Sequence, residues 1–206
     1  AAPLARAETA APPPASSADL PAGAYTIDKA HSTLIFRVSH LGFSHYTAAF
    51  ARFEAALEID PKDPAKAKLS AKVDPTSLTL PSPPEGFVQE LLGPNWLDAA
   101  KYPEMTFVST AVELTGANTA DITGDFTLHG VTKPVVLSAT FNGGYAGHPM
   151  DPHARIGFSA KGQIKRSDFG ISAGIPAPGT TMGVSDEVEI IIEAEFNGPP
   201  LKEGAP

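Results

Sequence analysis

The sequence contains no cysteine, which excludes disulfides, thiolate metal sites and cysteine nucleophiles. This absence leaves the compartment open, because an exported protein can do without disulfides. No apolar run approaches the roughly 20 residues of a membrane-spanning helix, so we expect no stable membrane insertion. Basic residues are scarce, and 15 Lys and Arg against 23 Asp and Glu give a net charge of −8. Nucleic acid is therefore disfavoured as a partner, since phosphate binding needs clustered Lys and Arg.

Glycine and proline are abundant instead. The 18 Gly and 21 Pro make up about a fifth of the chain, against a usual level of roughly 12%, which suits a turn-rich β protein. Residues 1–23 are rich in Ala and Pro and have no aromatic residue. Such a segment buries too little apolar surface to offset the entropy of ordering it, so we predict a disordered tether. Residues 199–206 are predicted to be a frayed tail, and one domain is expected between them, over 24–198.

The domain alternates repeatedly between apolar and polar residues with period two, the pattern of half-buried strands. The segments with this pattern are 32–40, 51–60, 68–74, 104–114, two within 124–143, 155–165 and 186–196. Short links between successive strands indicate antiparallel pairing, and the charged faces indicate that one side is wet. An open sheet of eight strands would leave two edges and one bare apolar face, so the pattern predicts an all-β, eight-stranded antiparallel barrel.

One segment, "SPPEGFVQELLGPNWLDAAKYP", does not alternate. Ser82 and Glu85 have the spacing of a capping box, with Pro83 at the first helical position. Gly93 and Pro94 are expected to end the helix. This predicts a short helical insert between strands three and four, placed over one end of the barrel.

Many positions expected to face the barrel interior carry small side chains. They are Ala51, Ala55, Ala71, Ser109, Ala111, Gly124, Ala139, Ala160, Gly162 and Ala194. An eight-stranded barrel either fills itself with side chains or holds one slender ligand, and so many small residues favour a cavity. The alternative is a solid core in which small and large residues interleave. Because the inward faces carry almost no charge, a guest would be a long apolar chain. The expected lining is Leu34, Phe36, Val38, Phe53, Phe107, Phe126, Leu128, Phe158, Ile164 and Ile190.

Residues that could suggest an enzyme or a metal site lack the necessary context. His31 and Ser32 precede a strand, but no nucleophile elbow accompanies them, so we expect His31 to bind backbone near a barrel end. His129 with Gly130 is predicted to form a tight turn between two strands. The remaining histidines lie in predicted loops, without the spacing of two that strand ligands need. They are His40, His45, His148 and His153. We predict no catalytic residue and no metal site.

The polar cluster "KRSDFGI" is followed by a long loop, residues 170–187. Arg166 and Asp168 could form a structural ion pair, or Arg166 or Lys165 could hold an anionic head group at the cavity mouth. The loop could be a mobile flap over the opening or an edge where a partner docks. Residues expected at the mouth are Trp96, Phe87, Phe169 and Arg166.

Five stretches, in this order, resemble the YceI-like family of bacterial periplasmic proteins. They are "YTIDKAHSTLIFRVSHLGFS", "NWLDAAKYPEMTF", "GDFTLHGVTKPVVL", "GFSAKGQIKRSDFGI" and "DEVEIIIEAEF". The resemblance implies a lipocalin-like barrel with an isoprenoid or other long-chain lipid inside it, no further cofactor, and often a homodimer. It also implies a periplasmic location after export through a cleaved signal peptide. A start at Ala1 fits a removed signal, although a chain begun there by cloning would look the same.

Together these observations predict an exported, non-enzymatic protein that sequesters or carries a polyisoprenoid-type lipid. A polyprenyl phosphate and an isoprenoid quinone are both candidates. One alternative is an envelope interaction protein with a filled barrel, docking to a membrane redox complex without a ligand. Another is a lipid-modifying enzyme.

Overall fold

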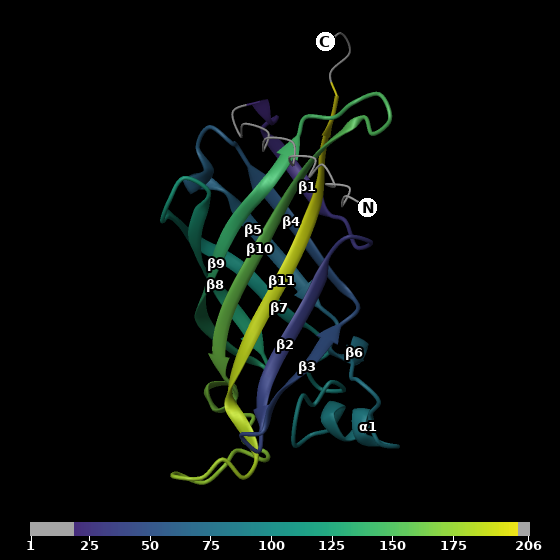
Figure 1. Ribbon diagram of the computed structural model, residues 1–206, viewed down its shortest axis with the longest axis vertical. Helices are drawn as coiled ribbons and strands as arrows, with labels where there is room; N and C mark the ends of the chain where they lie inside the picture. The colour runs from purple at the N-terminus through teal and green to yellow at the C-terminus, as the bar shows by residue number, and fades with distance from the viewer. Residues whose placement is uncertain (1–18, 202–206) are drawn as a thin grey trace, which may run out of the picture.

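The structure is a computed structural model that describes residues 19–201, so most of the predicted tether and tail lies outside the described residues. Its strands alternate with short turns and form one antiparallel sheet (Figure 1). The strands are β1 (Gly23–Ile27), β2 (Thr33–His40), β3 (Ser44–Phe50), β4 (Phe53–Ile59), β5 (Lys68–Val73), β6 (Leu78–Thr79), β7 (Met105–Leu114), β8 (Thr119–Leu128), β9 (Val131–Tyr145), β10 (His153–Lys165) and β11 (Val184–Pro200). One helix, α1 (Phe87–Leu92), and the 3-10 turns η2 (Pro64–Lys66), η3 (Pro75–Ser77) and η4 (Arg166–Phe169) connect them.

The sheet closes because β1 pairs with both β4 and β11. The closed order is β1-β4-β5-β7-β8-β9-β10-β11, which confirms the predicted eight-stranded antiparallel barrel. Three barrel strands are interrupted. β1 and β2 together form one barrel strand, which pairs with β11. β3 and β4 form the next barrel strand. β5 and β6 form the third, because β5 pairs with β4 and β6 pairs with β3. The fold therefore contains more strand segments than barrel strands.

The described barrel reaches slightly beyond the predicted domain limits of 24–198. Leu20, within the predicted tether, is buried in the cluster that contains Tyr25, Ile156 and Phe196. The Tyr25 hydroxyl donates a 2.6 Å hydrogen bond to the carbonyl of Pro21. At the other terminus β11 continues to Pro200. Residues 20–23 and 199–200 are thus part of the packed structure.

The interruption between β3 and β4 overturns one inward assignment. Ala51, predicted to face the interior, lies in the break and is exposed. Its N–H donates to the carbonyl of the buried Ser77, whose hydroxyl accepts from the N–H of Arg52. The Arg52 guanidinium is in turn bound to Asp74, at 2.7 Å. The turn before β6 therefore fixes the kink, a long-range contact that a local alternation pattern does not contain.

A β-bulge in β7 overturns a second assignment. The register with β8 shifts between Ser109 and Ala111, so the alternation inverts. Ala111, predicted to point inward, is exposed, and Val112 faces the interior in its place. The hydroxyl of Ser109 accepts a 2.8 Å hydrogen bond from the N–H of Leu69, which replaces the missing ladder bond between β5 and β7.

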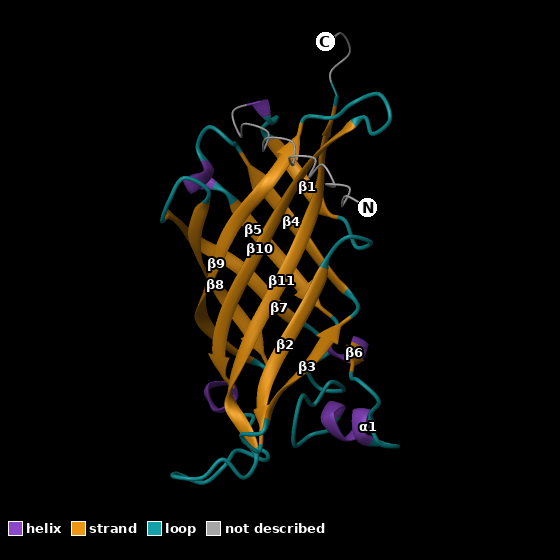
Figure 2. Cartoon of the chain, viewed as in Figure 1, coloured by secondary structure: helices purple, strands orange, loops and turns teal. Residues whose placement is uncertain are grey.

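The helical insert lies between β6 and β7 as predicted, beside the lower end of the barrel (Figure 2). The predicted capping box is wrong, because Ser82 and Glu85 precede the helix and Gly86 is its N-cap. Gly86 has a φ of +78°, the left-handed region that glycine tolerates. The predicted end is correct, since Gly93 is the C-cap. Within residues 19–201, no helix has the length and apolar content needed to cross a membrane.

Two inward glycines make room for neighbouring side chains rather than for a ligand. A Cβ at Gly124 would lie 2.3 Å from the Phe107 ring, and one at Gly162 would lie 2.7 Å from Leu137. Phe107 and Leu137 are both buried. The expectation that Gly124 and Gly162 leave open volume is therefore wrong.

We expect Gly124→Ala to lower the free energy of unfolding by about 1–2 kcal/mol, because the buried Phe107 ring must shift. Gly157→Ala is the matched control, since a Cβ there would meet no atom closer than 4.0 Å. Urea melts of the two variants measure the difference. Equal stability of the two would show that the ring moves without cost.

Candidate functional site

The barrel is hollow. A cavity of about 570 Å³ lies inside it, within the range of roughly 300–1,000 Å³ that is typical of small-molecule sites. Its wall is almost entirely hydrocarbon, contributed by every barrel strand and by the α1 segment. Among the described residues of the wall, Arg166 is the only one with a permanent charge. This arrangement fits an elongated apolar guest.

The ten residues predicted to line a cavity all lie in its wall. They are Leu34, Phe36, Val38, Phe53, Phe107, Phe126, Leu128, Phe158, Ile164 and Ile190. Five of these side chains line the inside of a closed barrel but are only half-buried. They are Phe36, Phe53, Phe126, Phe158 and Ile190. In a solid core, residues at these positions would be fully buried. The exposure is therefore exposure to the cavity, while their contact with a ligand stays a prediction.

Five of the small inward residues supply the open volume. Ala55 and Ala71 are register partners on β4 and β5, and Ala139 and Ala160 are partners on β9 and β10. In the closed strand order these two pairs lie on opposite walls of the barrel. With Ala194 they all line the cavity. The missing side-chain volume is thus distributed around the barrel.

Arg166 places a buried cation at the lower end of the cavity. Its guanidinium is held by backbone carbonyls, with Nε donating to Ser185 at 3.0 Å, Nη1 to Ala173 at 3.0 Å and Nη2 to Val184 at 2.9 Å. The predicted ion pair with Asp168 is absent from the described structure, where Asp168 is exposed. Burial lowers the pKa of Arg166, although a guanidinium stays protonated at neutral pH. Within residues 19–201, the cavity therefore holds a cation without a carboxylate in contact with it.

Trp96 packs against this cation. The Arg166 guanidinium lies 5.2 Å from the centre of the Trp96 ring, a cation–π distance. Trp96 and Phe87 both belong to the cavity wall, and their place at its mouth stays a prediction. Phe169 lies outside the wall. It is 2% exposed, packs edge-on against Phe126, and belongs to the core rather than to the mouth.

Part of the lower wall was not predicted. Tyr46 and Phe50 line the cavity from β3, a strand that is not among the predicted ones. His40 and His45, expected in loops, lie at the end of β2 and within β3. The run from 44 to 50 does alternate, with Tyr46, Ala48 and Phe50 on one face, and this signal could have revealed the strand.

The turn expected at His129 is present. His129 and Gly130 join β8 to β9 with φ values of +53° and +75°, as a two-residue hairpin turn requires. The His129 Nδ1 atom lies 3.1 Å from the carbonyl oxygen of Phe169, so the ring ties this turn to η4.

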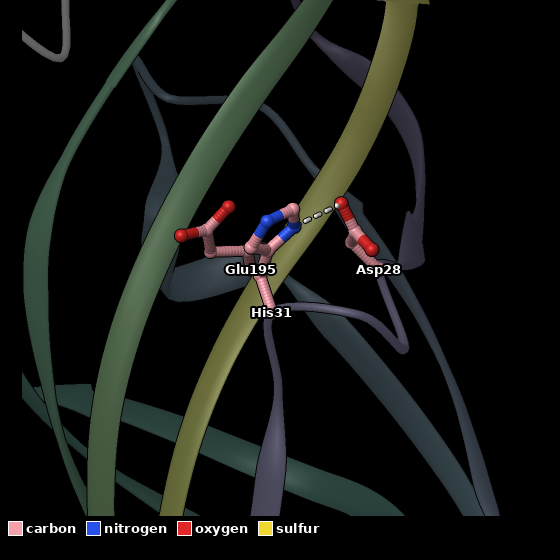
Figure 3. A group of neighbouring side chains, drawn as sticks. All are labelled: Asp28, His31 and Glu195. Atoms are coloured by element: carbon pink, nitrogen blue, oxygen red, sulfur yellow. Dashed lines mark hydrogen bonds and ion pairs between the residues drawn. The ribbon is translucent and has the colours of Figure 1, made fainter.

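The grouping of His31, Ser32 and an aspartate does not form a catalytic triad. The His31 ring binds the Asp28 carboxylate at 3.0 Å rather than backbone, which corrects the predicted role (Figure 3). The Ser32 hydroxyl accepts a hydrogen bond from the N–H of Glu195 instead of meeting His31. Within residues 19–201, nothing therefore activates this serine.

Asp28, His31 and Glu195 approach one another closely enough to suggest a metal site. However, Nη1 of Arg155 donates to Asp28 at 2.7 Å and to Glu195 at 2.8 Å. A guanidinium thus already bridges these two carboxylates, and its Nε also donates to Asp151 at 3.3 Å. Hydrogen bonds from His31 and Arg155 hold the pKa of Asp28 well below its usual range, and the bond to Asp28 raises the pKa of His31. The group is an ion-pair network that ties the β1–β2 corner to β10 and β11.

We expect Arg155→Leu to lower the free energy of unfolding at neutral pH by about 1–2 kcal/mol, because the carboxylates of Asp28, Asp151 and Glu195 lose a charged donor. Asp28 has a depressed pKa, so its contribution is present above its unfolded value of about 3.9 and is lost as the pH falls below it. The gap between wild type and variant should therefore narrow in acid. Urea melts at several pH values measure it, and a gap that widens below pH of about 4 would contradict this network.

Comparison with known proteins agrees with this geometry. The YceI-like domain family matches residues 25–196. A UPF0312 protein of Pseudomonas putida is 40% identical over 176 residues, which cover 84% of this chain and 86% of that protein. The crystal structure of BcnA from Burkholderia cenocepacia has a TM-score of 0.70 at 27% identity, covering 82% of this chain and 98% of that one.

A more distant structure has the same fold. It is a polyisoprenoid binding domain from Saccharophagus degradans, implicated in plant cell wall breakdown. The TM-score is 0.62 at 14% identity, and the match covers 85% of this chain and 98% of that domain. At this identity the likeness shows a shared fold and no more.

Proposed function

The chain belongs to the YceI-like domain family, and from this premise we propose that it holds one polyisoprenoid-type lipid inside its barrel. The observation that carries the proposal is the hollow apolar interior, with half-buried aromatic side chains facing it. Each CH₂ group moved from water into such a cavity contributes about 0.8 kcal/mol, so a long chain has ample driving force. The Saccharophagus degradans domain supplies one precedent for a polyisoprenoid ligand in this fold.

The proposed role is sequestration or transport rather than catalysis. The matching family has no assigned catalytic activity. We propose that the protein is exported to the periplasm and keeps its lipid out of water there. A long isoprenoid chain is insoluble in an aqueous compartment and needs such a carrier.

Arg166 supports a polar or anionic head group at the lower end. Its three bonds to carbonyls leave guanidinium N–H groups for a further acceptor. In the part of the chain that the structure describes, no carboxylate forms an ion pair with Arg166, and Asp186 acts on it only at longer range. A phosphate accepts from a guanidinium more strongly than a neutral carbonyl does. A polyprenyl phosphate therefore fits this cavity better than an isoprenoid quinone, and both belong to the proposed class.

The single tryptophan provides the experiment that tests this proposal. Trp96 lies in the cavity wall, so a bound lipid should change its fluorescence. Delipidated protein is titrated with a polyprenyl phosphate, a polyprenol or a quinone, each delivered from methyl-β-cyclodextrin. We expect a saturable change that ends at one lipid per barrel. A signal that never saturates, or none with any of the three lipids, would reject the proposed function.

A further inference from the structure

Two segments without any Asp, Glu, Lys or Arg meet at the lower end of the barrel. Residues 38–51 include the β2–β3 turn, and residues 169–185 include the long loop before β11. Figure 1 shows that this turn and this loop form the lower tip of the molecule along its longest axis. We call residues 41–43 and 171–183 the apolar tip.

The apolar tip is a built structure in which the turn and the loop are bonded to each other. The N–H of Leu41 donates to the carbonyl of Gly183 at 2.8 Å, and Val184 pairs with His40. Gly42 has a φ of +73°, and a Cβ there would lie 3.0 Å from Thr181. The turn and the loop are therefore closely packed, and the loop is also fixed by the carbonyl contacts of Arg166.

The packed turn and loop expose two large apolar side chains to solvent. Phe43, on the turn, is 81% exposed, and Met182, on the loop, is 68% exposed. Leu41, next to Phe43, has a φ of +56°, a costly conformation for a residue other than glycine. Leu41 and Gly42 are the two central residues of the hairpin turn that joins β2 to β3, and this turn holds Phe43 in its exposed position. Two large apolar side chains exposed on adjoining segments indicate an interaction site.

The apolar tip adjoins the cavity wall. His40 and Val184 flank its two segments and both belong to the wall, as does Tyr46 on β3. The wall also reaches the opposite end of the barrel, at Pro61, Pro64 and residues 116–119. The opposite end of the barrel differs, because its β4–β5 connection carries Asp60, Lys62, Asp63 and Lys66. The charge-free end is therefore the one suited to an apolar medium.

We propose that the apolar tip inserts into the surface of a lipid bilayer and that the cavity is loaded from the bilayer through this end. The inference rests on the proposed function for its cargo, because a long isoprenoid chain resides in a bilayer before a carrier takes it. A second copy of the chain fits less well. A stable dimer buries about 800 Å² on each partner, and one aromatic side chain supplies roughly 150–250 Å².

Loading from phosphatidylcholine vesicles that contain a polyprenyl phosphate tests this inference, with Trp96 fluorescence as the readout. We expect the double variant Phe43→Ser, Met182→Ser to load at least about tenfold more slowly than wild type, because the lost apolar contacts weaken docking. Met150→Ser is the matched control. Met150 is 89% exposed, in the connection between β9 and β10 at the far end of the barrel, and its loss should not change the rate.

Loading from methyl-β-cyclodextrin separates this inference from the proposed function. All three proteins should load equally from cyclodextrin, since that route does not use a bilayer. Equal loading from vesicles as well would overturn the apolar tip as a docking surface. If no protein loads by either route, flotation of the proteins with plain phosphatidylcholine vesicles decides. Weaker flotation of the double variant than of wild type supports the apolar tip as a docking surface, and equal flotation overturns it. A wild-type dimer that the double variant abolishes would also overturn it.

Discussion

A phenylalanine in place of Ala160 is expected to stop the protein from taking up a long-chain lipid while the barrel stays folded. Ala160 lies in the cavity wall on β10, beside Ala139 on β9. A phenyl ring there projects into open volume rather than into packed atoms, so it blocks the path of a chain at little cost in stability. We expect affinity for a polyprenyl phosphate to fall at least about tenfold, and the melting temperature to change by less than about 4 °C.

Lys161→Phe is the matched control for this prediction. Lys161 is the next residue on β10, exposed on the outer face, and the same ring placed there should leave lipid uptake unchanged. Isothermal titration and thermal melts of both variants provide the comparison. A strongly destabilised Ala160→Phe protein would show instead that the interior is tightly packed, as in the filled-barrel alternative.

Removing the buried cation should change both stability and ligand preference. Arg166→Met leaves three backbone carbonyls without their donor, so we expect the free energy of unfolding to fall by about 3 kcal/mol. In addition, affinity for a polyprenyl phosphate should fall at least about tenfold more than affinity for the uncharged polyprenol, because only the phosphate uses the charge.

Arg166→Lys separates these two effects. It keeps the positive charge but cannot reproduce the three-carbonyl geometry, so it should lose stability and still prefer the phosphate. Urea melts and titrations with the phosphate and the polyprenol measure both quantities. If Arg166→Met lowers the affinity for both lipids equally, Arg166 does not bind the phosphate and only stabilises the long loop.

The sequence predicted the barrel because period-two alternation is a local property of each strand. It did not predict features that arise between strands. The kink at Ala51 depends on Ser77, and the bulge at Ser109 depends on a bond from Leu69. The kink and the bulge each change the face of the sheet on which the following side chains lie. Neither can be recognised from the alternation of apolar and polar residues.

The cavity was predicted from small residues, and only some of them create it. Composition along a strand shows where volume is missing but not whether a neighbour fills it. Phe107 lies over Gly124, whereas Ala160 lines the open cavity. Similarly, a local capping-box pattern predicted a helix that begins at Ser82, but the helix begins after Gly86, which takes a left-handed conformation.

Arg166 shows the same limit at the candidate site. Its proximity in sequence to Asp168 suggested an ion pair, but the loop returns to β11 and offers the carbonyls of Ala173, Val184 and Ser185. The sequence therefore indicated the important cation without its partners. Those partners lie up to 19 residues further along the chain, on the long loop and at the start of β11, beyond the range of a local pattern.

Native mass spectrometry of protein purified without detergent tests the account most directly. A barrel that stores a lipid should carry an added mass equal to one long-chain isoprenoid, which organic extraction removes and a supplied polyprenyl phosphate restores. Protein that is purified without a bound lipid, and that binds none of the supplied isoprenoid lipids, would contradict a lipid-holding cavity.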